Sequence, residues 1–177
     1  MSRNILHTAM TEKIMIREGR SEELDEIMEV YRKAIAFMRS KGNKHQWVNG
    51  YPAKEDILED MKKGHNFVGV DSDGEIVVSF AYILGNDPTY EIIEGGSWLN
   101  DEEYGTIHRI ATSGKYSRMM EQCIDFCSRF SNNIRIDTHR DNRPMLEALN
   151  RLGFVRCGII YCRDGSPRIA FQKVFEK

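Results

Sequence analysis

One stretch in the C-terminal half of the chain constrains the fold most, because it places a strand, a helix and a second strand in direct succession. The run IRIDT over residues 134–138 predicts a strand. A helix is expected over residues 143–152, with Pro144 in its first turn and Gly153 at its C-terminal cap. A further strand is expected over residues 154–162. Strands and a helix joined by such short turns must pack on each other, which predicts a sheet covered by helices.

The rest of the chain shows the same two patterns. Apolar residues recur at helical spacing between Leu24 and Met38 and again between Tyr116 and Phe130, and Ser21 can cap the first of these helices. We expect helices over residues 21–39, 52–63 and 116–130, strands over residues 13–18, 66–70, 75–84, 106–112 and 168–175, and polar loops over residues 42–52 and 85–104. The predicted fold class is α/β or α+β, with one mixed sheet and helices on both faces.

The length and composition of the chain fit one domain. The chain has 177 residues, of which 41% are apolar, so it can bury a substantial core. No internal repeat, low-complexity segment or linker divides the sequence. We therefore expect a single domain over residues 14–177. Residues 1–13 are expected to be a disordered N-terminal tail, with a misassigned start as the alternative because Met10 and Met15 follow closely.

The charge balance argues against two classes of partner. The formal net charge is −2, so there is no electrostatic reason to expect nucleic acid or an anionic membrane as a partner. No apolar run approaches the ~20 residues that span a bilayer, and the N-terminus lacks the apolar stretch of a signal peptide. A cytoplasmic location, without nucleic-acid or membrane partners, is the resulting expectation.

The four cysteines do not have the spacing of a metal site. Cys123, Cys127, Cys157 and Cys162 form no C-x-x-C pair, so the usual zinc and redox motifs are absent. Cys123 and Cys127 lie one helical turn apart among Met and Phe residues. We interpret them as reduced core residues, with a reactive thiol as the alternative.

Several short motifs point to a known family. The run THRDN over residues 138–142, Met145, and the Leu152-Gly153-Phe154 turn resemble the end of the acyl-CoA module of the GNAT superfamily of acyl-CoA N-acyltransferases. Further matching positions occur along the chain at Trp47, Tyr51-Pro52, Gly96-Ser97-Trp98 and Arg168. The resemblance covers about residues 14–175 and is closest to small bacterial members. It implies a mixed, mostly antiparallel GNAT-like sheet.

The resemblance also implies where acetyl-CoA, the co-substrate, would bind. In the superfamily the pantetheine arm lies along the strand that reads TIHRIAT here, bonded to backbone groups near Ile110, Ala111 and Thr112. The pyrophosphate then lies at the N-terminus of the next helix, where free N–H groups favour an anion. The corresponding loop residues are Gly114, Lys115, Tyr116, Ser117 and Arg118. Gly114 supplies backbone freedom, and the two cations, Lys115 and Arg118, could neutralise phosphate charge.

Asn142 and Met145 form the second expected anchor for the co-substrate. In superfamily members the matching asparagine helps to hold the pantetheine or the helix start that faces it. The alternative for Asn142 is a plain N-cap of the following helix, and the two roles are compatible.

The pyrophosphate loop departs from the superfamily pattern Q/R-x-x-G-x-G/A. Neither alignment of the following helix puts two small residues at the glycine positions, which fall on Arg118 and Met120 or on Gly114 and Tyr116. This departure motivates an alternative function. The chain would then be a degenerate GNAT-fold binding or regulatory protein with weak or no binding of CoA.

The resemblance defines the chemistry that side chains must supply. Many members use a tyrosine as general acid where Leu149 stands here, so Tyr161 on the next strand is the best substitute. Candidates for the general base are His108, Glu94, and His139 oriented by Asp137. Strand alternation predicts that His108, Ile110 and Thr112 share one face, and that Asp137 and His139 also share a face. For each of these residues a structural role is the alternative, and water could take the proton instead.

The residues do not identify the acceptor substrate. Polar loops carry Trp47, Tyr51, Tyr90, Trp98 and Tyr104, which could wall an acceptor site or simply pack the loops down. Arg168 would suit an acceptor that carries a carboxylate. The predicted function is an N-acetyltransferase that moves an acetyl group from acetyl-CoA to an amine of a small molecule or peptide. A homodimer is a further option that the resemblance implies.

Overall fold

A computed structural model describes residues 11–176 of the chain. Its helices are α1 Leu24–Ser40, α2 Lys54–Lys62, α3 Met119–Cys127 and α4 Arg143–Arg151. Its strands are β1 Met15–Glu18, β2 Asn66–Val70, β3 Ile76–Leu84, β4 Gly105–Thr112, β5 Asn133–Thr138, β6 Val155–Tyr161 and β7 Pro167–Val174. Short 3-10 turns lie at Ser21–Glu23 and Pro88–Tyr90.

The strands form one sheet in the order β1-β2-β3-β4-β5-β7-β6. All neighbouring strands are antiparallel except β4 and β5, which are parallel. The parallel pair requires a crossover connection, and α3 supplies it. The fold class expected from the sequence, a mixed and mostly antiparallel sheet with helices, is confirmed.

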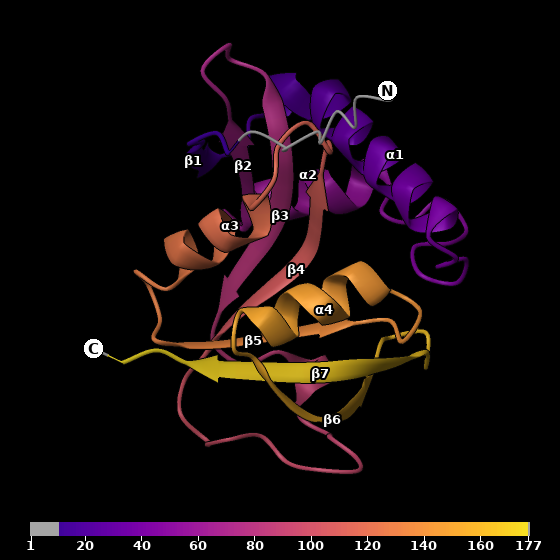
Figure 1. Ribbon diagram of the computed structural model, residues 1–177, viewed down its shortest axis with the longest axis vertical. Coiled ribbons are helices and arrows are strands. Elements are labelled where there is room, and N and C mark those ends of the chain that lie inside the picture. The colour runs from indigo at the N-terminus through magenta and orange to yellow at the C-terminus, as the bar shows by residue number, and fades with distance from the viewer. Residues whose placement is uncertain (1–10, 177) are drawn as a thin grey trace, which may run out of the picture.

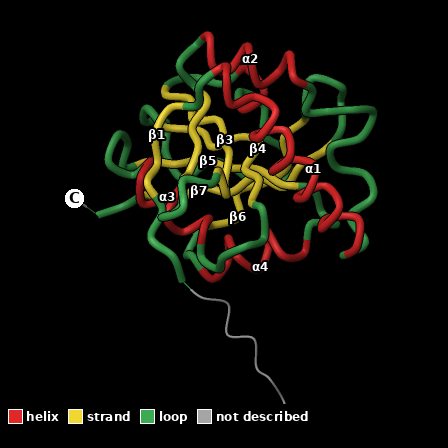
Figure 2. Tube along the Cα trace, turned by 90° about the horizontal axis from the view of Figure 1, so that it is seen from above, coloured by secondary structure: helices red, strands yellow, loops and turns green. Residues whose placement is uncertain are grey.

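Helices cover both faces of the sheet (Figure 2). Ile27, Val30 and Tyr31 of α1 and Ile57 of α2 pack on one face, against Val68 and its neighbours. The opposite face is covered by α3 and α4, whose buried side chains join strand residues in the largest core cluster. Members of that cluster are Phe80, Ile107, Cys123, Cys127, Ile134, Ile136, Leu149 and Phe171. The apolar stripes of the helices thus face the sheet, as their spacing predicts.

The sheet opens between its two central strands. Strand β4 pairs with β5 only where Gly105–Ile107 faces Ile134–Ile136. Beyond Ile107 the two strands diverge, so that β3 and β4 run steeply while β5 and β7 lie almost horizontal in Figure 1. The backbone of β4 from residue 108 onward therefore has no strand partner on the β5 side, which leaves polar groups available to a ligand.

Most predicted elements are present, but two helices are shorter than expected. Ser21–Glu23 form a 3-10 turn, so that α1 begins at Leu24 and Ser21 does not cap it, and the helix expected over residues 116–130 ends at Cys127. The helix expected over residues 116–130 begins at Met119, because Arg118 takes a left-handed conformation with φ 62° that a helix cannot include. Cys123 and Cys127 are buried and unpaired, and burial raises the pKa of both thiols. No helix among residues 11–176 is long and apolar enough to cross a membrane. The tail expected over residues 1–13 lies mostly outside the described residues, and the single-domain assignment stays a prediction.

Candidate active site

A cleft of about 1040 Å³ occupies the opening between β4 and β5. It is bordered by the end of β4, the end of β5, the start of α4, the α1–α2 loop and the β6–β7 turn. Of the residues that the sequence singled out, the cleft is lined by Trp47, Tyr51, His108, Ile110, Ala111, Thr112, Gly114, Asp137, Asn142, Met145, Cys162 and Arg168. The divergence of the strands thus brings residues from both halves of the chain to one hollow.

A β-bulge interrupts β4 at the mouth of the cleft. Arg109 and Ile110 together stand opposite Phe80, and Arg109 has φ 53°. The carbonyl oxygen of Arg109 accepts a hydrogen bond of 2.8 Å from the hydroxyl of Tyr31. A positive φ costs a non-glycine residue about 1 kcal/mol or more, so the surrounding contacts must hold this conformation.

The bulge corrects one expectation from the sequence. Regular alternation would put His108 and Ile110 on the same face, but Ile110 packs with Ile107 in the core below α3 and α4. The ring of His108 instead contacts Tyr90 on the other face, with ring centroids 5.7 Å apart. The extra residue of the bulge shifts the alternation by one position.

His108 is held by a carboxylate that the sequence did not bring to notice. Its Nε2 lies 2.6 Å from Oδ2 of Asp87, and its Nδ1 lies 3.8 Å from Oδ1 of Asp137. The hydroxyl of Tyr90 donates to the same oxygen of Asp137 at 2.6 Å. Thr89 donates to Asp87 through both its backbone N–H and its hydroxyl. This arrangement assigns the imidazole proton to Nε2 and leaves the Nδ1 lone pair for a further partner.

Two pKa values in this cluster are displaced by their surroundings. Burial alone would raise the pKa of Asp87, but the hydrogen bonds from His108 and Thr89 hold it well below its ordinary value. Burial, together with the neighbouring Asp137, raises the pKa of Tyr90 well above its usual range. Asp87 is therefore a permanent carboxylate at neutral pH, and Tyr90 is a permanent hydroxyl donor.

The expected pairing of Asp137 with His139 is wrong. Strand β5 ends at Thr138, so alternation does not extend to His139. The imidazole of His139 lies near His45 and Asp141 instead, and the backbone N–H of Asp141 donates to its Nδ1 at 3.1 Å. Burial and the charge of Arg168 lower the pKa of His139.

A buried ion pair fastens the bulge to α2. Arg109 donates from Nε and Nη2 to the carboxylate of Asp60 at 2.5 to 2.9 Å, and from Nη1 to the hydroxyl of Tyr51 at 2.9 Å. Two parallel bonds of this kind fix the guanidinium in one plane. The same contacts stabilise the unusual backbone of Arg109.

The loop expected to hold a pyrophosphate borders the cleft only at its first residues, and its later side chains are bonded to protein carboxylates. Gly114 has φ 80° and lines the cleft together with Ser113 and Met120. Lys115 is drawn away, because its Nζ lies 2.7 Å from both Asp71 and Glu75 in the β2–β3 turn. The Lys115 hydrogen bond is also the main cause that lowers the pKa of Asp71 to about 2.

Two further side chains of that loop also point to protein partners. The hydroxyl of Tyr116 donates to Asp71 at 3.1 Å, and Arg118 forms an ion pair with Glu121. The cleft is not lined by Lys115, Tyr116, Ser117 or Arg118. Arg118 uses only its Nε for Glu121, so its other donors could reach a phosphate without breaking the ion pair, whereas Lys115 is held by two carboxylates. Both assignments stay predictions.

Asn142 caps its helix and also bridges the cleft. Its Oδ1 accepts from the backbone N–H of Met145 at 3.3 Å, as the N-cap reading predicts. Its Nδ2 donates at 3.0 Å to Oε1 of Gln46 in the α1–α2 loop, 96 residues away in sequence. Gln46 also accepts from Asn43 at 2.8 Å. These three amides join the loop to the start of α4.

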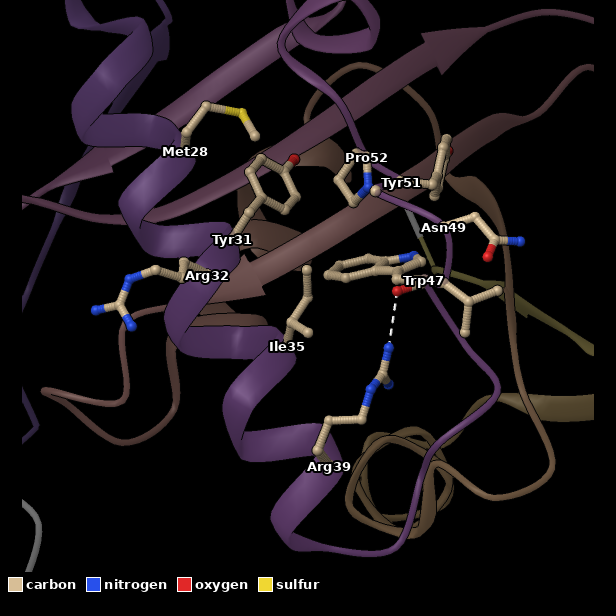
Figure 3. A pocket seen from close by; sticks show the side chains of 11 residues that line it. Met28, Tyr31, Arg32, Ile35, Arg39, Trp47, Asn49, Tyr51 and Pro52 are labelled. Carbon is tan, nitrogen blue, oxygen red and sulfur yellow. Dashed lines mark hydrogen bonds between the residues drawn. The ribbon is translucent and has the colours of Figure 1, made fainter.

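The α1–α2 loop separates the cleft from a second, smaller hollow of about 480 Å³ (Figure 3). Trp47, Val48, Asn49 and Tyr51 border both hollows. Arg39 reaches from α1 to donate to the carbonyl oxygen of Trp47 at 2.8 Å and to that of Asn43 at 2.7 Å. Figure 3 shows Trp47 beside Ile35 and Tyr31 on the wall of this second hollow, and the rings of Trp47 and Tyr31 have centroids 5.6 Å apart. The loop is thereby held as a fixed wall of the cleft.

Tyr161, the candidate general acid, lies away from the cleft. Its side chain is exposed at the edge strand β6, and its hydroxyl donates to Glu94 at 2.7 Å. Its neighbour Ile160 faces the cleft instead. Leu149, at the position where the family often has tyrosine, is fully buried. Tyr161 as acid and Glu94 as base would therefore both require their side chains to separate and turn toward the cleft.

Comparisons with known proteins agree with this architecture. An acetyltransferase of the GNAT family from Streptococcus agalactiae is 32% identical to the chain, with a TM-score of 0.83, and the match covers 96% of this chain and 100% of that one. A GNAT-family acetyltransferase from Listeria monocytogenes matches with 16% identity and a TM-score of 0.69, covering 95% and 100%. One from Bacillus cereus matches with 18% identity and a TM-score of 0.57, covering 93% and 99%. No family model and no curated protein matches the sequence.

Proposed function

The chain belongs to the GNAT family of acetyltransferases, and on that premise we propose that it transfers an acetyl group from acetyl-CoA to the nitrogen of an amine. The observation that carries the proposal is the position of His108, which lies beside the β4 bulge where the strands diverge. A base and a set of unpaired backbone groups thus border the same hollow.

The donor side of the cleft fits the co-substrate. The open edge of β4 from Ile110 to Thr112 offers backbone N–H and C=O groups that have lost β5 as a partner. The hydroxyl of Thr138 is buried at the end of β5 and has no hydrogen-bond partner within the described part of the chain. Buried hydroxyls rarely remain unbonded, so an amide of the pantetheine arm would satisfy it.

The first turn of α3 supplies a site for the pyrophosphate. Within the helix, hydrogen bonding begins at Gln122, whose N–H donates to the carbonyl of Arg118, so the N–H groups of the three preceding residues have no partner in the helix. With the helix dipole they favour an anion, and Gly114 leaves the approach open. This backbone site does not depend on Lys115 or Arg118.

His108 would act as the general base. With its Nε2–H directed at Asp87, the Nδ1 lone pair takes a proton from the acceptor ammonium, and Asp87 stabilises the imidazolium that results. The free amine attacks the thioester carbonyl while a backbone N–H of the bulge stabilises the negative oxygen. As the C–N bond forms and the C–S bond breaks, the nitrogen loses its second proton to the departing thiolate, directly or through water, and CoA leaves as the thiol. The imidazolium then returns its proton to solvent.

Calorimetry with acetyl-CoA and with CoA, followed by mass spectrometry of reaction mixtures with an amine panel, tests this function. We expect binding at micromolar to millimolar concentration and the transfer of one acetyl group to an amine. Product detection is preferable to thiol titration, because Cys162 is partly exposed in the cleft. Binding without turnover of any amine would favour the alternative, a GNAT-fold binding or regulatory protein. Absence of binding at millimolar ligand contradicts the donor site.

A further inference from the structure

The charges that line the cleft are unevenly paired. Every carboxylate on its wall already has a hydrogen-bond donor or cation from the protein. The pairs are Asp56 with the Ala53 N–H, Glu59 with Lys63, Asp60 with Arg109, Asp87 with His108, Asp137 with Tyr90, and Asp164 with Ser166. Three cations on the wall, Lys33, Arg163 and Arg168, have no ion pair among residues 11–176. The wall therefore offers unpaired positive charge and little unpaired negative charge.

Arg168 is the cation best placed to contact an acceptor. Lys33 and Arg163 are exposed, whereas Arg168 is half-buried on β7. Both of its hydrogen bonds come from Nη1, to the Ser166 hydroxyl and the Pro167 carbonyl at 3.1 Å each. The other guanidinium donors have no partner in the described chain, so one side of the guanidinium remains available to a ligand.

The sheet register places Arg168 near the proposed base. Asp137 on β5 stands opposite Ala170 on β7, and Arg168 is two residues from Ala170 on the same face. Such diagonal neighbours lie about 7–8 Å apart. Asp137 is in turn 3.8 Å from Nδ1 of His108. His108 and Arg168 therefore both lie beside Asp137 on the wall of the same cleft, so one small acceptor could place its nitrogen at His108 and an anionic group at Arg168.

We propose that the acceptor is a primary amine that also carries a carboxylate a few bonds from the nitrogen, as amino acids do, with Arg168 binding the carboxylate while His108 faces the amine. The proposal rests on the proposed function and specifies its substrate class. A guanidinium binds a carboxylate through two parallel hydrogen bonds, which favours this planar anion. An amine without the carboxylate would forgo these two charge-assisted bonds and should therefore be the poorer acceptor.

The experiment compares acetylation of matched acceptors. We would measure product by mass spectrometry for the standard amino acids, for their primary amides and for the corresponding decarboxylated amines. With the wild-type protein we expect kcat/KM for at least one amino acid to exceed that of its amide and of its decarboxylated amine by roughly 10- to 100-fold. This comparison needs no variant, so it does not depend on the folding of a mutant.

Variants then assign the preference to Arg168. Arg168→Met should remove the preference by lowering kcat/KM for the amino acid, and should leave the decarboxylated amine nearly unchanged. Arg168→Lys should restore part of the preference, and Arg163→Met, on the adjacent turn, should keep it. Binding of CoA should be the same in all of these proteins. A second readout is an NMR titration, in which Arg168→Met raises the pKa of His139 because a nearby positive charge is removed.

The outcomes separate the two proposals. If amides and plain amines are acetylated as well as the amino acids, or if Arg168→Met keeps the preference, the substrate class is wrong while the transferase function stands. If acetyl-CoA does not bind and no amine is acetylated, the proposed function fails and the substrate class fails with it. A preference for amines that carry a phosphate over those that carry a carboxylate would also overturn the inference.

Discussion

Nε2 of His108 lies 2.6 Å from Oδ2 of Asp87, a residue 21 positions earlier at the start of the long loop that follows β3. The contact fixes the tautomer of an imidazole beside the β4 bulge and turns its second nitrogen toward Asp137. A change to either residue of this pair should therefore alter turnover or the pH dependence of stability.

His108→Gln should lower kcat by roughly 10²- to 10⁴-fold, because the side chain keeps its approximate size but can no longer take the proton of the acceptor. Binding of acetyl-CoA, measured by calorimetry, should change little. His139→Gln is the matched control, since His139 lies near the cleft without a contact to Asp87 or Asp137, and its turnover should stay close to that of the wild type. Equal losses in both variants would exclude His108 as the specific base.

Asp87 should make folding stability depend on pH. Its pKa in the folded protein is below the unfolded value of about 3.9, so its contribution is fully present above that value and declines as the pH falls toward the folded pKa. Asp87→Asn removes this contribution. Urea unfolding should show a clear stability difference between wild type and variant at pH 7 and a smaller difference at pH 3. An equal difference at both pH values would contradict the depressed pKa.

Gln46→Ala should destabilise the protein by about 1–3 kcal/mol, because Asn43 and Asn142 would each lose a buried acceptor for their amide N–H groups. The free energy of unfolding in urea measures this loss. Lys44→Ala, at an exposed neighbouring position, is the control and should stay within about 0.5 kcal/mol of the wild type. A similar small effect for Gln46→Ala would mean that the amide chain does not hold the loop.

Arg109→Met should cost about 3–5 kcal/mol, because it leaves the carboxylate of Asp60 buried without its partner and removes the contacts that stabilise the positive φ of the bulge. Tyr51→Phe removes only one hydroxyl from the same cluster and should cost about 1 kcal/mol. Thermal or urea unfolding compares the two. A similar loss of unfolding free energy in both variants would show that the ion pair is not the main contact that stabilises the bulge.

Local patterns in the sequence predicted much of the fold. Helical and strand spacing located the main helices and strands, and Asn142 could be recognised as an N-cap from its place before Pro144. These features need only the geometry of neighbouring residues.

The errors at the candidate site arose where local geometry changes. The bulge at Arg109 and Ile110 shifted the faces of β4, and the end of β5 at Thr138 separated His139 from Asp137. The sequence analysis missed Asp87 as a partner of His108. An aspartate before Pro88 is typical of the cap of a short turn, and Asp87 does cap the turn Pro88–Tyr90. Its role beside His108 depends on a loop folding back over the sheet.

The sequence by itself determined the elements, their order and the family resemblance, because hydrophobic spacing and capping act over a few residues. Only the tertiary structure decided which polar groups meet. It joined Asp87 to His108, Gln46 to Asn142 and Lys115 to Asp71 across long separations in the chain. The physical reason is that these contacts depend on strand register, on the divergence of β4 from β5 and on one bulge, and a shift of a single residue in any of them turns a side chain to the opposite face.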